Sequence, residues 1–310
     1  MHELAGRPAF VGRRLLLRRI WAYVELTKPR VLELLLLTTA PVMVLAQRGI
    51  PDLWLIAATV TGGVLSGGSA AAFNMYVDRD VDARMRRTAK RPLVTGEVSP
   101  RAGLTFAWAL AVASTAWFLV TVNLLSAALS AFAIFFYVVV YTVLLKRRTE
   151  QNIVWGGIAG CFPTLIGWSA VTDALSWSAV VLFVLVFLWT PAHYWPLSVN
   201  YRDDYRAANI PMLGATRSTR HVAARVVTYA FATVLCSMVL IPVAGMGLLY
   251  SVVIVASGGW FLYDACRFYG QTRTSDTVGD GPMRVFRSSI TYLALVFVAV
   301  AMDPLFHLTL

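Results

Sequence analysis

The chain reads VTGGVLSGGSAAAFNMYVDRDVDARM from Val60 to Met85, a small and apolar run that passes directly into a polar stretch. Asn74, Asp78 and Asp82 are spaced four residues apart in that polar stretch. At about 100° per residue in an α-helix, their side chains drift only about 80° around the axis. One helical face at the end of an apolar segment therefore carries an amide and two carboxylates, a set of oxygen ligands that can hold a divalent metal.

The composition places the rest of the chain in a lipid bilayer. Of its 310 residues, 58% are hydrophobic and 14% are charged, and the mean hydropathy is +0.66. Such a chain is too apolar for a soluble globular domain. Nine apolar segments are each long enough to cross a hydrocarbon core of about 30 Å. They cover residues 31–48, 54–77, 103–122, 124–145, 153–171, 179–199, 222–242, 247–265 and 287–305.

The gaps between these segments are short, so nothing in the sequence divides the chain into separate units. We therefore expect an all-α polytopic membrane protein, with about nine transmembrane helices in one bundle around a central cavity and a cytoplasmic loop cap. Residues 1–310 are expected to form a single domain, with residues 1–26 as an N-terminal cytoplasmic flank. The glycines, serine and alanines of segment 54–77 suit close helix packing or room for a ligand, and the sequence leaves both open.

Positive charge alternates along the chain and predicts the orientation. The 27 Lys and Arg residues gather before Val31, from Arg79 to Arg101 and in later loops at the same alternate ends, with Arg48 on the other side. By the positive-inside rule the N-terminus is cytoplasmic and the C-terminus lies outside. We favour the inner membrane of a bacterial cell over that of a mitochondrion, because the Arg-rich start runs straight into the first span. The net charge of +11 is split among loops and indicates no nucleic-acid partner.

A second acidic stretch, NYRDDYRAANIPML at 200–213, follows the sixth apolar segment. Four spans separate it from the first acidic stretch, so both emerge on one side of the membrane, and Asp203 and Asp204 are expected to converge with Asp78 and Asp82. Each stretch taken alone is also explained by local ion pairs with its own arginines. Two carboxylate clusters interleaved with cations are instead typical of a site for Mg²⁺ and a diphosphate.

The run NMYVDRDVDARMRRTAKRPLVTGEVSP resembles the first signature of the UbiA superfamily of intramembrane prenyltransferases. Five further motifs resemble, in order and spacing, the branch of that superfamily that farnesylates haem. Together they extend the resemblance from Thr27 to Asp303. The five motifs are LTKPRVLELLLLTTAP, LKRRTEQNIVWGG, WTPAHYW, DDYRAANIPML and VFRSSITYLALVF.

The resemblance implies a reaction and its participants. Farnesyl diphosphate and haem b would be the substrates, Mg²⁺ the cofactor, and haem O, the precursor of haem A, the product. A haem vinyl group would attack the farnesyl cation and water would then add. A downstream haem A synthase is a candidate partner beside the lipid bilayer itself. We assign catalysis to Asn74, Asp78, Asp82, Lys146, Arg147 and Asp204, metal binding to Asn74, Asp78, Asp82, Asp203 and Asp204, and substrate contacts to Arg79, His193, Arg202, Asp203 and Tyr205.

Two positions leave the assignment open. His193 lies inside a span, where an imidazole can ligate haem iron, handle a proton or serve as a hydrogen-bonded core residue. Asn200 stands where many superfamily members carry an acid, so the second metal site is expected to be weaker or richer in water.

Two other functions are compatible with part of the pattern. A prenyltransferase of the same superfamily acting on an aromatic acid such as 4-hydroxybenzoate would share the first signature but not the motifs of the haem branch. A secondary transporter would place ionisable groups near the bilayer midplane on broken helices. The acids of this chain instead gather at cytoplasmic helix ends.

Overall fold

The computed structural model describes residues 8–274 and 279–306, apart from the side chains of residues 8–16, 30–36 and 274, and its regular elements are helices. Eight spans within these described parts are long and apolar enough to cross a membrane. The predicted span 31–48 corresponds to α2, Pro29–Gln47, whose described apolar part runs from Leu37 to Gln47. The expected all-α, multi-pass fold is therefore confirmed. The eight spans comprise α3 (Leu53–Asp82), α5 (Pro100–Thr121), α6 with η1 (Leu124–Phe135 and Phe136–Leu145), α7, η2 and α8 (Asn152–Gly156, Gly157–Cys161 and Phe162–Thr172), α9 (Trp177–Asn200), α12 (Thr219–Ala244), α13 (Leu248–Thr274) and α14 (Gly281–Phe306).

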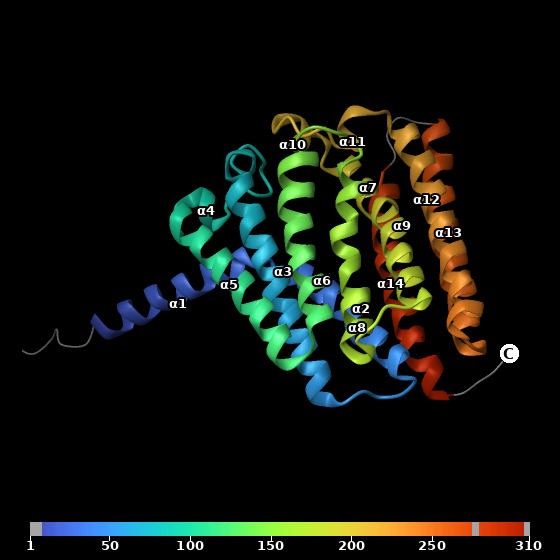
Figure 1. The fold of residues 1–310 in the computed structure, drawn as a ribbon. Helices are drawn as coiled ribbons and strands as arrows, with labels where there is room; N and C mark the ends of the chain where they lie inside the picture. The colour runs from blue at the N-terminus through green and yellow to red at the C-terminus, as the bar shows by residue number, and fades with distance from the viewer. Residues whose placement is uncertain (1–7, 275–278, 307–310) are drawn as a thin grey trace, which may run out of the picture.

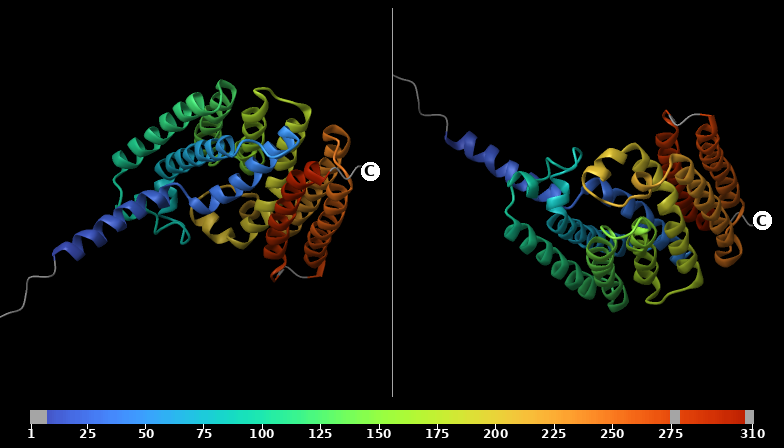
Figure 2. Two further views of the ribbon diagram at one scale, coloured as in Figure 1. Left: turned by 90° about the horizontal axis from the view of Figure 1, so that it is seen from below. Right: turned by 90° about the horizontal axis from the view of Figure 1, so that it is seen from above.

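Helix α2 connects the two halves of the bundle. It packs against α3, against α8 near the middle of the chain and against α14 from the last part. The remaining long helices pack mainly on their sequence neighbours, as α3 does on α5 and α13 on α14, while α14 also returns to α9. Figures 1 and 2 show the long helices running side by side, with helix α1, Pro8–Leu26, extending away from the bundle. The predicted N-terminal flank thus contains a helix.

The small residues of α3 serve close packing against α5. A Cβ atom at Gly62 would lie 2.6 Å from Phe118 Cε2, so only glycine allows the helices to approach this closely. The hydroxyl of Ser114 donates a hydrogen bond of 3.0 Å to the Gly62 carbonyl, and Ser69 donates one of 2.8 Å to the Ala107 carbonyl. Small residues and interhelical hydroxyl bonds replace the hydrophobic effect as the source of association between helices in lipid.

Two of the spans deviate from regular α-helix where they approach α3 and α9. After Phe135 the chain winds as a π-helix to Leu145, and the Thr142 hydroxyl donates to the carbonyl of Tyr137, five residues earlier, at 2.8 Å. The next span is split into α7, a 3₁₀ turn and α8. Gly156 in α7 lies against the ring of Tyr141, since a Cβ there would lie 2.1 Å from Tyr141 Cδ2. Single π-helical turns often mark functional sites.

Short helices and loops cover one end of the bundle. Helices α10 (Arg202–Ala207) and α11 (Leu213–Thr216) lie at that end in Figure 1, and α4 (Pro92–Thr95) follows the end of α3. Glu150, between η1 and α7, pairs with Arg217 at 2.8 Å and holds the η1–α7 loop to the α11–α12 connection. Where α13 begins, at the opposite end of the bundle, both carboxylate oxygens of Asp303 accept backbone hydrogen bonds, from Gly247 N–H at 2.6 Å and from Tyr250 N–H at 2.9 Å. These contacts fix the ends of the helices that frame the bundle.

Candidate active site

The three polar residues of the first acidic stretch lie on the last turns of α3 and are turned into the bundle. Asn74, Asp78 and Asp82 are 2%, 0% and 3% exposed, respectively. Helix α3 continues to Asp82 without a break, so the four-residue spacing places the three side chains on one helical face as predicted. A buried carboxylate is costly unless it is paired or coordinates a metal, so its partners decide what this face can do.

A chain of hydrogen bonds joins Asn74 and Asp78 to η1 and to the residue that precedes α2. Lys28 Nζ donates to Asn74 Oδ1 at 2.6 Å, and Asn74 Nδ2 donates to Asp78 Oδ2 at 2.7 Å. Lys146, immediately after η1, donates to the same oxygen of Asp78. Thr142 Oγ1 accepts from Asn74 Nδ2 at 3.2 Å. The π-helix thus directs both Thr142 and Lys146 at the α3 face.

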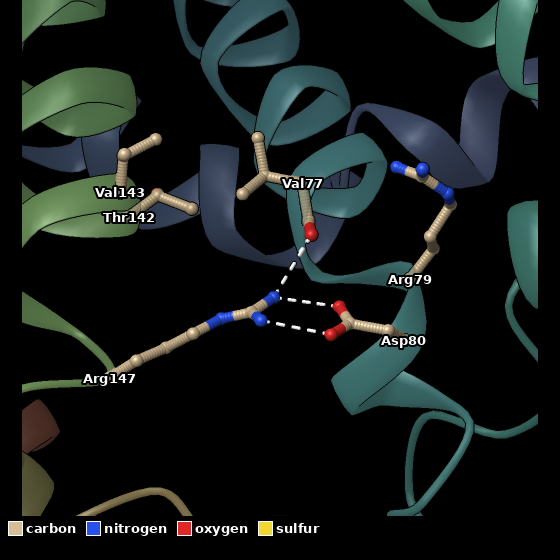
Figure 3. Close-up of a pocket in the computed structure, with 6 residues that line it drawn as sticks. All are labelled: Val77, Arg79, Asp80, Thr142, Val143 and Arg147. Carbon is tan, nitrogen blue, oxygen red and sulfur yellow. Dashed lines mark hydrogen bonds and ion pairs between the residues drawn. The ribbon is translucent and has the colours of Figure 1, made fainter.

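Arg147 connects this buried face to an open groove on the outside of the bundle. Its guanidinium forms two hydrogen bonds of 2.9 and 2.7 Å with Asp80 and one of 3.0 Å with the Val77 carbonyl. The same group lies 3.5 Å from Asp78 Oδ1. Figure 3 shows Arg147 reaching across to Asp80 in a groove of about 460 Å³, from which Arg79 extends away. The hydrogen bonds to Asp80 raise the pKa of Arg147 further above its usual value.

The third residue of the face is held by the loop that follows α3. Arg91 Nη1 lies 2.5 Å from Asp82 Oδ2, and the Thr88 hydroxyl donates to the Asp82 carbonyl at 2.9 Å. Within the described parts of the chain, four cations thus surround three carboxylates and give the site an excess of positive charge. The cations are Lys28, Arg91, Lys146 and Arg147, and the carboxylates are Asp78, Asp80 and Asp82.

The donor set of this face fits Mg²⁺. Asp78 Oδ1 is buried and has no hydrogen-bond partner, and the Arg147 guanidinium lies 3.5 Å from it. Carboxylate and amide oxygens are the protein ligands that Mg²⁺ accepts, usually together with phosphate oxygens. One buried carboxylate oxygen with unused acceptor capacity, beside an amide oxygen, therefore fits a metal shared with a phosphorylated ligand.

Lys28 has an unusual environment for a lysine. It lies half-buried between α1 and α2 and contacts Asn74. Burial, with the neighbouring charges of Arg91 and Lys146, lowers the pKa of Lys28 to about 7. A further cation near neutral pH is therefore costly here unless an anion enters the site.

The acids of the second stretch are not brought to the buried face. The Asp203 side chain is 98% exposed and lies 4.0 Å from Arg206. Asp204 is half-buried, and its side chain has no hydrogen bond or ion pair with any described residue. Arg202 bonds to the Gly214 carbonyl at 2.5 Å and to the Thr219 hydroxyl at 3.0 Å, so it holds α11 and α12. No group of three His, Cys, Asp or Glu side chains in the described ranges is close enough to hold a metal.

The two motif-bearing loops nevertheless meet, through an arginine and tyrosines. Arg87, in the loop after α3, donates to the Tyr205 hydroxyl at 3.3 Å and lies over the ring of Tyr201 at 5.1 Å. Tyr205 is buried, and its hydroxyl lies 2.9 Å from that of Tyr194 on α9. The roles predicted for Asp203 and Asp204 stay predictions, and in this structure the two loops meet through Arg87 and Tyr205 rather than through the acids.

His193 is placed in a rigid aromatic slot between α9 and α14. Its ring stacks on Trp189 with centroids 4.2 Å apart and on Phe286 with centroids 4.5 Å apart. Its Nδ1 lies 2.9 Å from the Ser289 hydroxyl oxygen, and Ser289 donates to the Phe286 carbonyl at 2.7 Å. Because the Ser289 proton is engaged with that carbonyl, Nδ1–H is the donor and Nε2 carries the lone pair.

Four residues that were not predicted from the sequence lie at the site in the folded chain. Lys28, Arg91 and Thr142 contact the α3 face, and Arg87 connects the two loops. For Lys28 a signal was present, because LTKPR runs directly into the first span. Arg87 and Arg91 belong to a run of basic residues in which the sequence alone distinguishes none. Thr142 carries no signal, because a threonine in an apolar helix is ordinary.

Fold and site together define a class: a polytopic helical membrane protein that holds a buried, cation-rich polar site near one end of its bundle. Residues 35–279 match the UbiA prenyltransferase family. A relative from Leifsonia xyli subsp. xyli, named protoheme IX farnesyltransferase, is 58% identical over 295 residues, which are 95% of this chain and 95% of the relative. The chain therefore belongs to the UbiA prenyltransferase family, and it is a prenyltransferase.

Two solved structures share the fold at low sequence identity. One comes from work on digeranylgeranylglyceryl phosphate synthase, with a TM-score of 0.73 and 13% identity over 93% of this chain and 99% of that chain. The other is a UbiA homolog from Archaeoglobus fulgidus bound to GPP and Mg²⁺, with a TM-score of 0.63 and 15% identity over 90% of this chain and 99% of that chain.

Proposed function

We propose that the chain transfers the farnesyl group of farnesyl diphosphate to a vinyl group of haem b, with addition of water, and so produces haem O. The use of a diphosphate substrate is supported by the buried face of Asn74, Asp78 and Asp82, which four cations surround in the described structure. The haem acceptor rests on the Leifsonia relative, whose name states that activity and whose length the chain matches almost completely.

The cations around α3 would stabilise the leaving group. The bond between farnesyl C1 and its diphosphate oxygen breaks to give an allylic cation and a diphosphate anion. Preorganised cations lower this barrier because they meet charge that develops in the transition state. Lys146 and Arg147 are the cations that neutralise Asp78, and Lys28 adds charge from the connection between α1 and α2. These three residues are our candidates for diphosphate contact, with Arg79 as an outer contact on the groove.

Asn74, Asp78 and Asp82 would hold Mg²⁺ when it is bound. Mg²⁺ would act there as a Lewis acid on the diphosphate oxygens. The Archaeoglobus fulgidus homolog, which is bound to GPP and Mg²⁺, supports Mg²⁺ as the choice of metal. Asp203 and Asp204 are proposed as ligands of a second ion, and a rearrangement of α10 would be needed to turn Asp203 inward, since its side chain is 98% exposed.

The acceptor half of the reaction needs a nucleophile beside the cation. A haem vinyl carbon forms the new bond to farnesyl C1, and water adds to the cation left on the adjacent vinyl carbon and loses a proton. We propose that His193 ligates the haem iron through Nε2, because Ser289 holds Nδ1–H at 2.9 Å and two aromatic rings fix the plane of the imidazole. Tyr205 is proposed as a substrate contact on the cap.

The setting of the reaction follows from charge and composition. We propose a single catalytic domain in the inner membrane of a bacterial cell, with the N-terminus and the capped end of the bundle facing the cytoplasm. Diphosphate is charged and water-soluble, so release on that side suits the polar cap, while the farnesyl chain and haem stay in the apolar bundle. A haem A synthase that takes up the product is the proposed protein partner.

A product assay tests the proposed reaction. Purified protein in detergent, supplied with farnesyl diphosphate, Mg²⁺ and haem b, is expected to yield haem O by mass spectrometry. Asp78→Asn should abolish the product, while Asp173→Asn should not, because Asp173 is exposed and its backbone φ of 49° also suits asparagine. Prenylated 4-hydroxybenzoate in place of haem O would refute the proposed acceptor but not the diphosphate site.

A further inference from the structure

A second polar groove lies far from the α3 face, between α13 and α14. It has a volume of about 340 Å³. Its lining combines acidic, basic and hydroxyl side chains with one aromatic residue. The lining residues are Trp260, Asp264, Asp280, Arg284, Arg287, Ser288 and Thr291. None of these residues takes part in the proposed prenyl transfer.

Asp264 is the feature of this groove that calls for a ligand. It lies within the apolar part of α13, is only 4% exposed, and its Oδ2 atom is buried with no hydrogen-bond partner. No ion pair joins it to any described residue. A carboxylate within a membrane span costs about 2.5 to 3.5 kcal/mol on insertion scales unless something compensates it. The groove gives a ligand access to this carboxylate.

The rim of the groove carries positive charge, opposite to that of the Asp264 carboxylate. Arg284 and Arg287 lie on the first turns of α14 and are exposed. Arg287 pairs with Asp280 at 2.7 Å, whereas Arg284 has no ion pair with a residue that the structure describes. The groove therefore presents an uncompensated carboxylate in its depth and an uncompensated guanidinium at its rim. A ligand that matches both has a cationic group and an anionic group a short distance apart.

The position of the groove suits a lipid headgroup. Asp264 lies ten residues before the end of α13 at Thr274, about 15 Å along the helix axis. Arg284 lies three residues after the start of α14, so the rim is at the helix ends. Trp260, one turn deeper on α13, is 49% exposed, as expected for an aromatic side chain in contact with the upper acyl chain. Arg284 thus lies near the ends of the two helices, and the groove extends from there to the Asp264 carboxylate within the span.

We propose that this groove binds a phospholipid whose headgroup carries a primary ammonium, with the ammonium on Asp264 and the phosphate on Arg284. A primary ammonium has N–H donors that satisfy the unpaired Asp264 oxygen, whereas a quaternary choline nitrogen has none. Guanidinium groups bind phosphate oxygens through charge-assisted hydrogen bonds. A bound lipid would also brace α14, which contributes Phe286 and Ser289 to the slot of His193.

The proposal is tested by lipid retention in native mass spectrometry of the full-length protein in detergent. The probes are phosphatidylethanolamine, its N-methyl and N,N-dimethyl derivatives and phosphatidylcholine, all with the same acyl chains. Retention should fall about tenfold only at the last methylation, because the final N–H is lost there. Equal retention of phosphatidylethanolamine and phosphatidylcholine by the unchanged protein would overturn the proposal without any variant.

Two variants test whether the preference for phosphatidylethanolamine over phosphatidylcholine comes from this groove. Asp264→Asn has the same shape but no charge, and it should bind the ethanolamine and choline lipids equally. Asp280→Asn is the matched control, because Asp280 lines the same groove but is exposed, and it should keep the ethanolamine preference. A preference that persists in Asp264→Asn would refute the assignment. Soluble phosphoethanolamine that displaces the lipid at equal concentration would overturn the lipid as the natural ligand.

Discussion

Replacing Lys146 by methionine removes the ammonium group that contacts the most deeply buried carboxylate of the site. The Lys146 side chain is 14% exposed and Asp78 is fully buried. In the variant, Asp78 Oδ2 keeps one hydrogen bond, from Asn74 at 2.7 Å, and Oδ1 has only the Arg147 contact at 3.5 Å. Removing one partner of a buried ion pair costs about 3 to 5 kcal/mol. Because Lys146 keeps some exposure, we expect the variant to lose about 3 kcal/mol in free energy of unfolding.

The same substitution should slow prenyl transfer. If Lys146 meets charge on the departing diphosphate, losing one preorganised donor is expected to lower the rate by about 10² to 10³, or about 2.7 to 4 kcal/mol of barrier. Arg148→Met is the matched control, since Arg148 is the next residue but one, is exposed and has no ion pair with a described residue. The control should leave both stability and rate within about twofold of the unchanged protein.

A second substitution separates the structural role of Lys146 from its catalytic role. Asp78→Asn together with Lys146→Met removes both charges, so the double variant should recover most of the thermal stability lost in Lys146→Met alone. Its activity should stay as low as that of the worse single variant. Thermal unfolding in detergent and formation of haem O give the two measurements. Recovery of activity along with stability would refute both the assignment of Asp78 to the metal and the assignment of Lys146 to the diphosphate.

Three further changes address other contacts of the site and the bundle. Lys28 has a pKa lowered to about 7, so it loses its positive charge as the pH rises through that value. The affinity for diphosphate, measured by calorimetry, should therefore fall between about pH 6 and 9. In Lys28→Arg, which stays charged, the affinity should change much less over this range. Asp303→Ala leaves two backbone N–H groups without an acceptor and should lower the free energy of unfolding by about 2 to 4 kcal/mol, with turnover per folded molecule unchanged. Tyr205→Phe removes the hydroxyl that Arg87 contacts at 3.3 Å, and faster hydrogen exchange in both loops should reveal their separation.

Local sequence rules accounted for most of the fold. Apolar length predicted the spans, and α3, α9 and α12 appear close to the expected ranges. The four-residue spacing correctly placed Asn74, Asp78 and Asp82 on one helical face. The irregular windings were not foreseen, because a π-helix and a 3₁₀ turn differ from α-helix by small shifts in backbone hydrogen bonding that apolar composition does not encode.

The partners of the acidic face could not be derived in the same way. The sequence predicted that two acidic clusters would converge, but in the described structure Asp78 contacts cations from other elements, and Asp203 is exposed. Topology shows that two loops emerge on one side of a membrane, yet it does not fix which side chains of those loops turn inward. In this chain Arg87 and Tyr205 turn inward and meet.

The sequence by itself determined that this chain is a helical membrane protein and that one face of its second span is polar, because both follow from side-chain transfer energies and helical periodicity along a continuous segment. Only the tertiary structure decided that Lys28, Arg91, Lys146 and Arg147 gather around that face. Those residues are far apart along the chain or in a run of similar charges. Their meeting depends on how rigid helices pack, and a buried carboxylate then takes whichever cations the packing brings within reach.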